Sequence, residues 1–427
     1  MKQHWKEPIK ILVEDFGPIE RADIELGDFT AIIGPNSSGK TFLINVVDKL
    51  MNFVSVAYSF AVPNSVFRAV EALIIKEENR GYPINIIMSE YPEDQVTMVV
   101  DHVVSELVRR GSQQNNGTWN IYPPFFQYFQ IDAKNLIRFG KDQARINARF
   151  ELMEIDIVVP QNKESSIVLS PDREFITKYV KGFRANFVGR GSASFGSSFR
   201  SQQLQSVLIP TERLSVLVTL PNIIEDLAKS RGLQSLFPIL QQGQQRQVTN
   251  PSLMDFLSKY LSAIQSITLT KTKISKDASD LIMGNLTLDV SLPYFINFIS
   301  GGNTLPLNLV SSGTLQLIPL VVLAESNLNS FLLIEEPEIN LHANKQVEVA
   351  EYLWKLVEER DKTILVSTHS DYFTMKLAHL SKDNRNKVLR VYLLNEGHTS
   401  PLKISKKGEI EEIKTIGEVM NKLLLEI

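Results

Sequence analysis

"FTAIIGPNSSGKTFLINVV", residues 29–47, is the stretch on which the interpretation of the whole chain depends. Phe29–Ile33 is a short apolar run of the kind that forms a buried strand, and Thr41–Met51 has the composition of a helix. Between them, Gly34 and Gly39 allow the backbone to curl, so that several N–H groups can point at one anion. The stretch therefore predicts a phosphate-binding loop between a strand and a helix.

The residue types in this loop suit a nucleoside triphosphate. The spacing from Gly34 to Thr41 matches the P-loop pattern in full. Lys40 is expected to reach the β- and γ-phosphates of ATP, and Thr41 to offer its hydroxyl to Mg²⁺. The helix that follows adds the positive end of its dipole. The expected nucleotide-binding residues are Gly34, Pro35, Asn36, Ser37, Ser38, Gly39, Lys40, Thr41 and Phe42.

The composition bounds the class of protein. With 427 residues, 43% of them hydrophobic and 22% charged, the chain can bury a large core. A net charge of −3 excludes a general polycation, and the absence of cysteine excludes disulfides and thiolate metal sites. No apolar run approaches the roughly 18 residues of a membrane helix, and residues 1–10 lack a signal-peptide core. We expect a cytoplasmic protein without membrane contact.

A second segment, "SFLLIEEPEINLHANKQ" from Ser330, places two carboxylates after a strand. Phe331–Ile334 is again a buried-strand run. In P-loop ATPases one carboxylate at such a strand end holds the Mg²⁺ shell, and a neighbour polarises the attacking water. Glu335 is the candidate metal ligand and Glu336 the candidate catalytic base. The alternative is an exposed acidic turn before Pro337.

A third segment, "KTILVSTHSDYF" from Lys362, places a histidine after a strand. The helical pattern Ala343–Glu359 followed by the apolar run Thr363–Ser367 predicts a parallel strand–helix–strand unit. Ligands bind beyond the carboxyl ends of such strands, so His369 is a candidate catalytic residue near the γ-phosphate. A purely structural histidine is the alternative.

A fourth segment, "NLVSSGTLQLIPLVV" at residues 308–322, places Ser311, Ser312 and Gly313 before a helical pattern. Taken alone, it predicts a helix whose N-terminus is capped by serine.

The order of these four segments resembles the ATP-binding-cassette (ABC) class of P-loop ATPases. The resemblance implies that the serine–glycine segment is the signature motif, in which Ser311, Ser312 and Gly313 meet the nucleotide held by a partner subunit. The segment departs from the transporter form Leu-Ser-Gly-Gly-Gln, which leaves the capped helix open as an alternative. The implied fold is α/β, a mixed sheet flanked by helices, with a large helical and β insertion between the P-loop and the signature motif. A homodimer, or a higher oligomer built from dimers, is implied with it.

Other segments are similar to one branch of this class. "IKILVEDFGPIERADIELGDFTAIIGPNSSGK" resembles the entry of RecF, SMC and OLD-like ATPases, and "EEPEINLH" and "STHSDYF" resemble OLD-like, AAA-annotated ATPases. "IPTER" at residues 209–213 is similar to a segment of that group, and Arg213 is expected either to touch nucleotide or to brace the sheet. A structural ion pair between Arg213 and a carboxylate is the alternative. The chain after His369 is too short for a Toprim nuclease domain. The resemblance implies a separately encoded effector, a nuclease or toxin.

The chain is expected to divide into a split ATPase core, residues 1–50 and 205–427, and an inserted lid or arm, residues 51–204. Within the insertion, helices are expected at Asn64–Arg80 and Pro92–Arg110 and strands within 142–170. No segment sustains three or four heptads, so long coiled-coil arms are not expected. After His369, strands are expected at Val388–Leu394 and near Pro401–Ser405.

Residues 175–211 contain no acidic residue and interleave basic with aromatic side chains in a Gly/Ser-rich setting. Such a segment can bind phosphates and stack bases, which makes it a candidate nucleic-acid contact. A loop or a protein–protein contact is the alternative. The side chains concerned are Lys178, Lys181, Arg184, Arg190, Arg200, Phe175, Tyr179, Phe183, Phe187, Phe195 and Phe199.

Three functions are compatible with these observations. The first is an ABC-class, OLD-like ATPase that dimerises around Mg-ATP and gates a partner effector in anti-phage defence. The second is a RecF- or SMC-like ATPase of DNA repair or recombination. The third is an ATP-dependent scaffold with little turnover.

Overall fold

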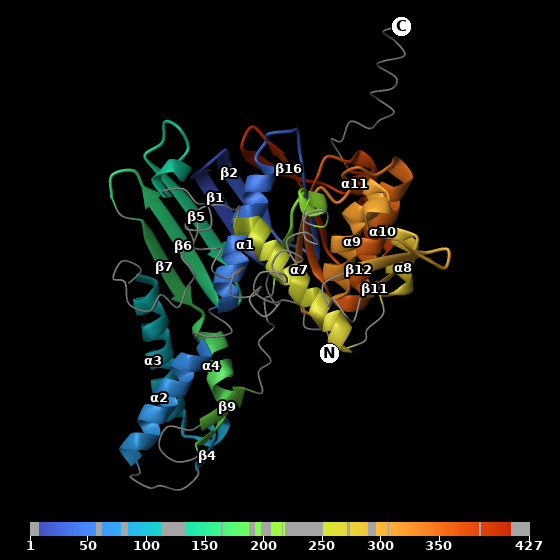
Figure 1. Cartoon of the computed structure of the whole chain (residues 1–427). Coiled ribbons are helices and arrows are strands. Elements are labelled where there is room, and N and C mark those ends of the chain that lie inside the picture. The colour runs from blue at the N-terminus through green and yellow to red at the C-terminus, as the bar shows by residue number, and fades with distance from the viewer. Residues whose placement is uncertain are drawn as a thin grey trace, which may run out of the picture. The chain divides into compact units, whose positions relative to one another are not determined.

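The computed structural model describes two compact units of the chain (Figure 1). One unit comprises Met1–Glu25, Lys49–Gln127 and Ile131–Leu204, and the other comprises Leu26–Asp48, Tyr128–Gln130 and Gln205–Ile427. The residues described are 8–56, 62–77, 84–112, 133–163, 165–187, 193–197, 206–215, 217, 251–270, 274–288, 296–305, 307–328, 330–383 and 386–410. The assignment of residues 51–204 as a lid or arm stays a prediction.

The unit that contains the P-loop is built on a largely parallel sheet. Neighbouring strands are parallel throughout, except that β17 is antiparallel to β16. The strands, in sheet order, are β10 (Ser206–Ile209), β14 (Phe331–Glu335), β15 (Thr363–Thr368), β3 (Phe29–Ile33), β16 (Leu389–Asn395) and β17 (His398–Leu402).

Helices and a small sheet complete this unit. α10 packs on the sheet, where the ring of Trp354 lies 6.1 Å from that of Phe29 on β3. α9 is buried from Thr314 to Glu325 on every side, which explains why its sequence is apolar all round rather than amphipathic. The elements are α7 (Pro251–Thr270), α8 (Lys276–Ile282), α9 (Ser312–Glu325), α10 (Ala343–Arg360), α11 (Asp371–Asp383), β11 (Asn285–Leu288), β12 (Ile296–Ser300), β13 (Asn303–Leu305) and the 3₁₀ turn η6 (Leu307–Leu309).

The strand order brings three sequence segments to one edge of the sheet. β15 lies between β14 and β3, with Glu335 opposite Ser367 and Thr368 opposite Ile33. Because the three strands are parallel, the chain that follows each of them emerges at the same end of the sheet. The predicted strand–helix–strand unit of β14, α10 and β15 is therefore confirmed.

The other unit is an antiparallel sheet with helices. The burial pattern of its strands alternates along the chain, so one face of the sheet is covered and the other is open to solvent. The strands, in sheet order, are β2 (Ile19–Glu25), β1 (Lys10–Phe16), β5 (Gln143–Arg149), β6 (Met153–Pro160) and β7 (Ser166–Pro171). The remaining elements are α2 (Val62–Glu77), α3 (Glu93–Ser112), α4 (Arg173–Lys181), β4 (Ile84–Ile87), β8 (Phe183–Phe187), β9 (Ala193–Ser197) and the 3₁₀ turns η2 (Met88–Glu90) and η4 (Ala133–Leu136).

The last strand differs from its prediction. β17 begins at His398, three residues before the expected start near Pro401. Glu396 and Gly397 both have positive φ, 48° and 81°, which forms a two-residue hairpin turn directly after β16. These two residues are the whole connection between β16 and β17, so the return strand starts at His398.

Among the described helices, none combines the length and the apolarity required to cross a membrane.

Candidate nucleotide site

The loop between β3 and α1 (Lys40–Val56) has an unusual backbone. Positive φ angles occur at Gly34 (152°), Ser37 (62°) and Gly39 (102°). At Gly34, a side-chain Cβ would lie 2.1 Å from the carbonyl oxygen of Leu394 on β16, so only glycine fits there. The loop conformation therefore depends on its glycines, as the motif predicts.

A Gly34→Ala substitution is expected to destabilise this unit and weaken ATP binding. The backbone cost alone is of order 1–3 kcal/mol. The contact with Leu394 adds to it, because the oxygen that the Cβ meets belongs to the backbone and the position of a Cβ is itself fixed by the backbone. Thermal denaturation and ATP titration measure the two effects. Gly302→Ala is the matched control, because Gly302 also has positive φ (80°) but has open space around the missing side chain. Equal losses in both variants would contradict the steric argument.

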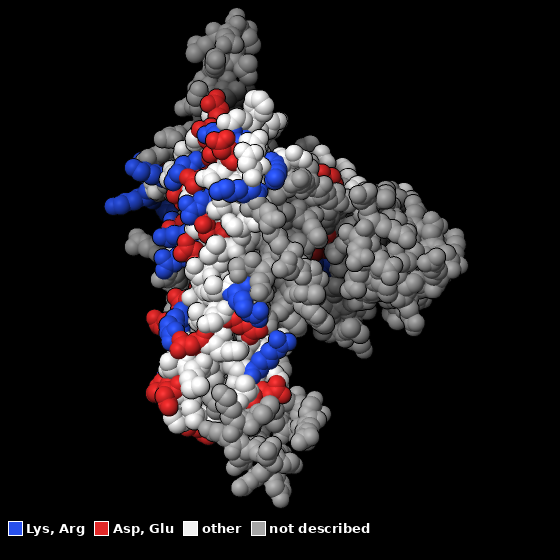
Figure 2. Space-filling model, turned by 90° about the vertical axis from the view of Figure 1, so that its left-hand side faces the viewer, with Lys and Arg blue, Asp and Glu red and all other residues white. Residues whose placement is uncertain are grey.

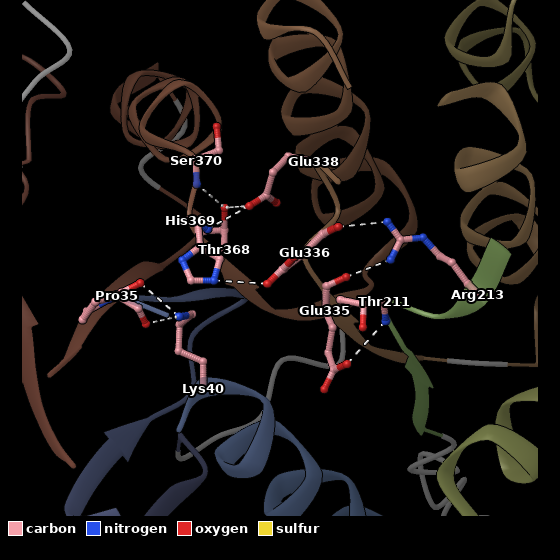
Figure 3. Close-up of polar contacts among 11 residues, drawn as sticks. Pro35, Lys40, Thr211, Arg213, Glu335, Glu336, Glu338, Thr368, His369 and Ser370 are labelled. Atoms are coloured by element: carbon pink, nitrogen blue, oxygen red, sulfur yellow. Dashed lines mark hydrogen bonds and ion pairs between the residues drawn. The ribbon is translucent and has the colours of Figure 1, made fainter. Parts of the chain in front are cut away.

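Lys40 lies inside the loop with its ammonium turned toward the loop carbonyls. Nζ donates to the carbonyl oxygens of Gly34 (3.0 Å) and Pro35 (2.7 Å), as Figure 3 shows for Pro35. Burial lowers the pKa of Lys40, and the charges of Glu336 and Glu338 oppose that shift. A cation held only by neutral carbonyls gains a stronger acceptor when an anion arrives. The arrangement fits a phosphate group.

Ser38 supports the same conclusion. Its hydroxyl is buried within the loop and has no hydrogen-bond partner among the described residues. Buried polar atoms are nearly always hydrogen-bonded, so an orphan hydroxyl beside Lys40 marks a place where a polar ligand fits.

Glu335, the last residue of β14, is only 3% exposed. Burial raises the pKa of Glu335 to about 7, although a hydrogen bond from the backbone N–H of Thr211 works against this shift. Asn45 on α1 donates to Glu335 Oε1 at 3.4 Å and to the carbonyl of Thr41 at 2.8 Å. Asn45 thus ties the carboxylate to the first turn of α1, a link that the sequence analysis missed.

The donor set of Thr41 and Glu335 suits Mg²⁺. Hydroxyl and carboxylate oxygens are the hard ligands that this ion prefers, and it usually takes only one or two protein ligands beside phosphate oxygens and water. Among the described residues, no cluster of three or more His, Asp or Glu side chains forms a metal cage. The residues present therefore fit an ion that is bound together with a nucleotide.

Glu336 and His369 face each other across neighbouring strands. Nε2 of His369 lies 3.1 Å from Oε1 of Glu336 (Figure 3). Glu336 adopts φ = 43°, a left-handed conformation that costs a residue with a side chain roughly 1–2 kcal/mol. Its backbone N–H donates to the carbonyl of Ser367 on β15 at 2.9 Å. The strained turn directs the carboxylate toward the histidine.

Glu338 is a second residue that the sequence analysis missed. It is 8% exposed and accepts hydrogen bonds from Thr368 Oγ1 (2.6 Å) and from the backbone N–H of His369 (2.8 Å). Burial raises the pKa of Glu338, and these two hydrogen bonds oppose the rise. Glu338 therefore holds the backbone of His369 in place. Its position two residues after the carboxylate pair was the available signal.

Ser311 caps α9. Its hydroxyl accepts from the backbone N–H of Thr314 at 3.3 Å and lies 3.0 Å from the Thr314 hydroxyl. Ser311 and Ser312 are exposed and Gly313 is half-buried, so the first turn of α9 is open to solvent. The capped helix is confirmed. The role of these residues toward a partner's nucleotide stays a prediction.

Arg213 braces the sheet rather than pairing with a carboxylate. The four hydrogen bonds that its guanidinium makes among the described residues all go to backbone carbonyl oxygens. Two of these carbonyls belong to Glu335 and Glu336 (Figure 3). Of the expectations for Arg213, the structure supports bracing through backbone carbonyls and not an ion pair with a carboxylate.

The interpretation of residues 175–211 as a base-stacking surface is wrong for the aromatic side chains that the structure describes. Phe175 and Tyr179 form the buried face of α4, and Phe183 is buried at the start of β8. The i, i+4 spacing of Phe175 and Tyr179 is that of a helix packed on a core, not of a row of stacking platforms. The side chains of Phe187, Arg190, Phe195, Phe199 and Arg200 lie outside the described residues.

The lysines of the same segment are paired with acidic side chains from nearby positions. Lys178 forms an ion pair with Glu174 on α4, and Lys181 forms one with Glu93 on α3 at 2.6 Å. Figure 2 shows Lys and Arg intermixed with Asp and Glu on one face of the molecule. A neighbouring turn of α4 supplies the acid for Lys178, and the tertiary structure supplies the one for Lys181, so these two lysines do not form an unbalanced positive patch.

Comparison with known proteins gives a family and several solved structures. A family model described as "AAA domain, putative AbiEii toxin, Type IV TA system" matches residues 29–375. A search of curated proteins finds no significant match.

The solved structures that match include the SMC head domain from Thermotoga maritima, with 14% identity, a TM-score of 0.39, and 93% of this chain and 99% of that chain covered. The Smc head domain with an extended coiled coil, bound to the C-terminal domain of ScpA, from Pyrococcus furiosus has 12% identity, a TM-score of 0.41 and coverages of 98% and 99%. A structure of the recombination mediator protein RecF has 12% identity, a TM-score of 0.36 and coverages of 94% and 100%.

Proposed function

The chain belongs to the family of AAA domains described as putative AbiEii toxin, Type IV TA system, and from this premise we propose that it is an ATPase that controls a separate effector. One observation carries the proposal. Lys40, Glu336 and His369 are far apart in the sequence but lie at the carboxyl ends of three adjacent parallel strands. That edge is where open α/β sheets bind nucleotides.

The proposed binding mode follows from the loop. The N–H groups of residues 34–41 and the N-terminus of α1 surround the phosphates of ATP, and Lys40 supplies the positive charge. Thr41 and Glu335 hold Mg²⁺, and Asn45 keeps them at a fixed separation. A bound Mg²⁺ would neutralise charge on the phosphate oxygens during transfer.

The proposed hydrolysis step depends on the pair of Glu336 and His369. Glu336 accepts a proton from the attacking water, which makes the oxygen a better nucleophile toward the γ-phosphorus. As this oxygen bonds to phosphorus, the bond from phosphorus to the β–γ bridging oxygen breaks, ADP leaves and inorganic phosphate is formed. His369, 3.1 Å from the carboxylate, orients it and contacts the γ-phosphate side of the site. Glu338 keeps His369 at this position through the hydrogen bond to its backbone.

The proposed assembly is a homodimer formed around ATP. The first turn of α9 presents exposed serines at the positive end of a helix that is buried from Thr314 onward, which suits an anion from outside the chain. Ser311, Ser312 and Gly313 would contact the γ-phosphate held by Lys40 of a second copy. The family description, a putative AbiEii toxin of a Type IV TA system, supports a role in defence. In that role, the proposed ATP turnover gates a separately encoded nuclease or toxin.

Phosphate release by the purified chain tests this function. We expect turnover with Mg-ATP that stops when the metal is chelated, and an ATP-dependent change in mass by light scattering. ATP binding without turnover, even with the effector present, would instead support a scaffold. Tight, salt-sensitive DNA binding by the chain alone would support a repair ATPase. The absence of ATP binding would refute the proposal outright.

A further inference from the structure

Arg213 is a fully buried cation beside the strand end that carries Glu335 and Glu336. Its side chain is 0% exposed, and burial lowers its pKa to about 10, which still leaves it charged at neutral pH. The nearby charges of Glu338, Glu335 and Glu336 favour the cation, but the hydrogen bonds that the guanidinium makes among the described residues all go to carbonyl oxygens. Burying a charge is costly unless the charge is hydrogen-bonded, so the backbone carbonyls around Arg213 are required to keep its guanidinium in place.

The guanidinium joins three segments that are distant in sequence. Nε donates to the carbonyl of Gln316 on α9 at 3.0 Å, and Nη1 donates to Pro210, just after β10, at 3.0 Å. Nη1 also donates to the carbonyl of Glu335 at 2.8 Å, and Nη2 donates to that of Glu336 at 2.9 Å. Figure 3 shows the two bonds to the end of β14. One side chain therefore bridges α9 and the strand end that carries both carboxylates.

The bond to Glu336 stabilises a strained residue. Glu336 has φ = 43°, and its peptide is held on one side by Ser367, which accepts from its N–H, and on the other by Arg213. If the donor at its carbonyl is lost, the backbone of Glu336 can relax toward negative φ. That rotation would turn the carboxylate away from His369 while leaving the fold of the strand intact.

The bond to Gln316 connects the same strand end to the exposed first turn of α9. Gln316 lies one turn after Ser312 and Gly313 on a helix that is buried from Thr314 onward. Packed helices move as rigid elements, so a force on the first turn displaces the Gln316 carbonyl and the guanidinium with it.

We propose that Arg213 is a positioning residue that couples the serine–glycine turn of α9 to the catalytic Glu336. The inference rests on the proposed ATPase function and adds how contact at Ser311–Gly313 reaches the carboxylates. A planar guanidinium is required, because its three nitrogens donate in fixed directions to acceptors on separate segments. A lysine ammonium donates from a single nitrogen and cannot reach the carbonyl acceptors on all of these segments at once.

The test is Arg213→Lys, compared with Lys362→Met. Lys362 is also a buried cation bonded to a backbone carbonyl, that of Ser326 at 2.8 Å, but it lies at the other end of α9 and precedes β15. We expect Arg213→Lys to bind ATP within threefold of the wild-type Kd while kcat falls at least tenfold. Lys362→Met should lower Tm yet keep kcat within twofold when assayed well below its Tm.

Three outcomes would overturn the coupling role. The first is a folded Arg213→Lys protein with wild-type kcat. The second is a decrease in kcat that is proportional to the decrease in Tm, with the same proportion in Arg213→Lys and Lys362→Met. The third is failure of both Arg213→Lys and a second variant, Arg213→Gln, to fold, which would make Arg213 a residue of the fold itself. A wild-type protein without turnover would instead refute the proposed function, which separates the two failures.

Discussion

A Glu336→Gln protein is expected to bind Mg-ATP with wild-type affinity and to hydrolyse it at least about a hundredfold more slowly. Glutamine keeps the shape of the side chain and the backbone bonds to Ser367 and Arg213, but it cannot accept a proton from water. Single-turnover phosphate release and ATP titration measure the two quantities. Glu348→Gln, on the exposed side of α10, is the matched control and should leave both unchanged.

The same substitution should trap the dimer. If ATP persists, the contact between Ser311–Gly313 of one copy and the γ-phosphate of the other persists with it, so the mass by light scattering should double on adding Mg-ATP. Adding Ser311→Arg should release the dimer, because bulk and charge then occupy the phosphate position.

Ser311→Ala separates docking from capping. Alanine removes the hydroxyl that accepts from Thr314 N–H and costs about 1 kcal/mol of helix stability, but it adds no bulk. We expect this variant to weaken the trapped dimer less than Ser311→Arg does. The signature role of the α9 turn is refuted if the Glu336→Gln protein has the same mass with and without ATP and the double variant, Glu336→Gln with Ser311→Arg, has that mass too.

A Lys40→Ala protein is expected to lose ATP turnover without unfolding. The two bonds of Lys40 go to carbonyls of its own loop, so the sheet and the helices keep their contacts when the ammonium is removed. Loss of the cation at the phosphates should lower kcat/KM at least about a hundredfold. Phosphate release measures the activity, and thermal denaturation measures the fold.

Lys376→Ala is the matched control for Lys40. Lys376 lies on α11 in the same unit and pairs with Glu351 on the surface, so its removal should leave turnover intact. A Lys40→Ala protein with unchanged kcat would exclude Lys40 from the site, and a Tm well below that of the control would show that its role is structural.

The family match confirms the resemblance to AAA-annotated P-loop ATPases, and the observed sheet confirms the expected fold class. Both could be predicted because the decisive patterns are local. The P-loop occupies contiguous residues whose backbone needs glycine at set positions, and Gly34 and Gly39 do have positive φ. The parallel strands are short apolar runs that end in polar residues, which a sequence displays directly.

Three features required the tertiary structure. Asn45 and Glu338 act on residues that other strands contribute, so their roles depend on contacts between elements that are distant in sequence. Phe175, Tyr179 and Phe183 looked like part of a binding surface, because the elements that bury them cannot be identified from their own segment. Lys181 finds its counter-charge in Glu93, 88 positions away.

The sequence by itself determined which residues carry the candidate chemistry: Lys40, Glu335, Glu336 and His369 each follow or end a readable strand. The tertiary structure alone decided how they are joined. Strand order places β15 between β3 and β14, and Arg213 connects β14 to α9 through backbone carbonyls. The physical reason is that every residue has a backbone carbonyl that can accept a hydrogen bond. The residue types of the partners of Arg213 therefore do not reveal, in the sequence, that they bind a guanidinium.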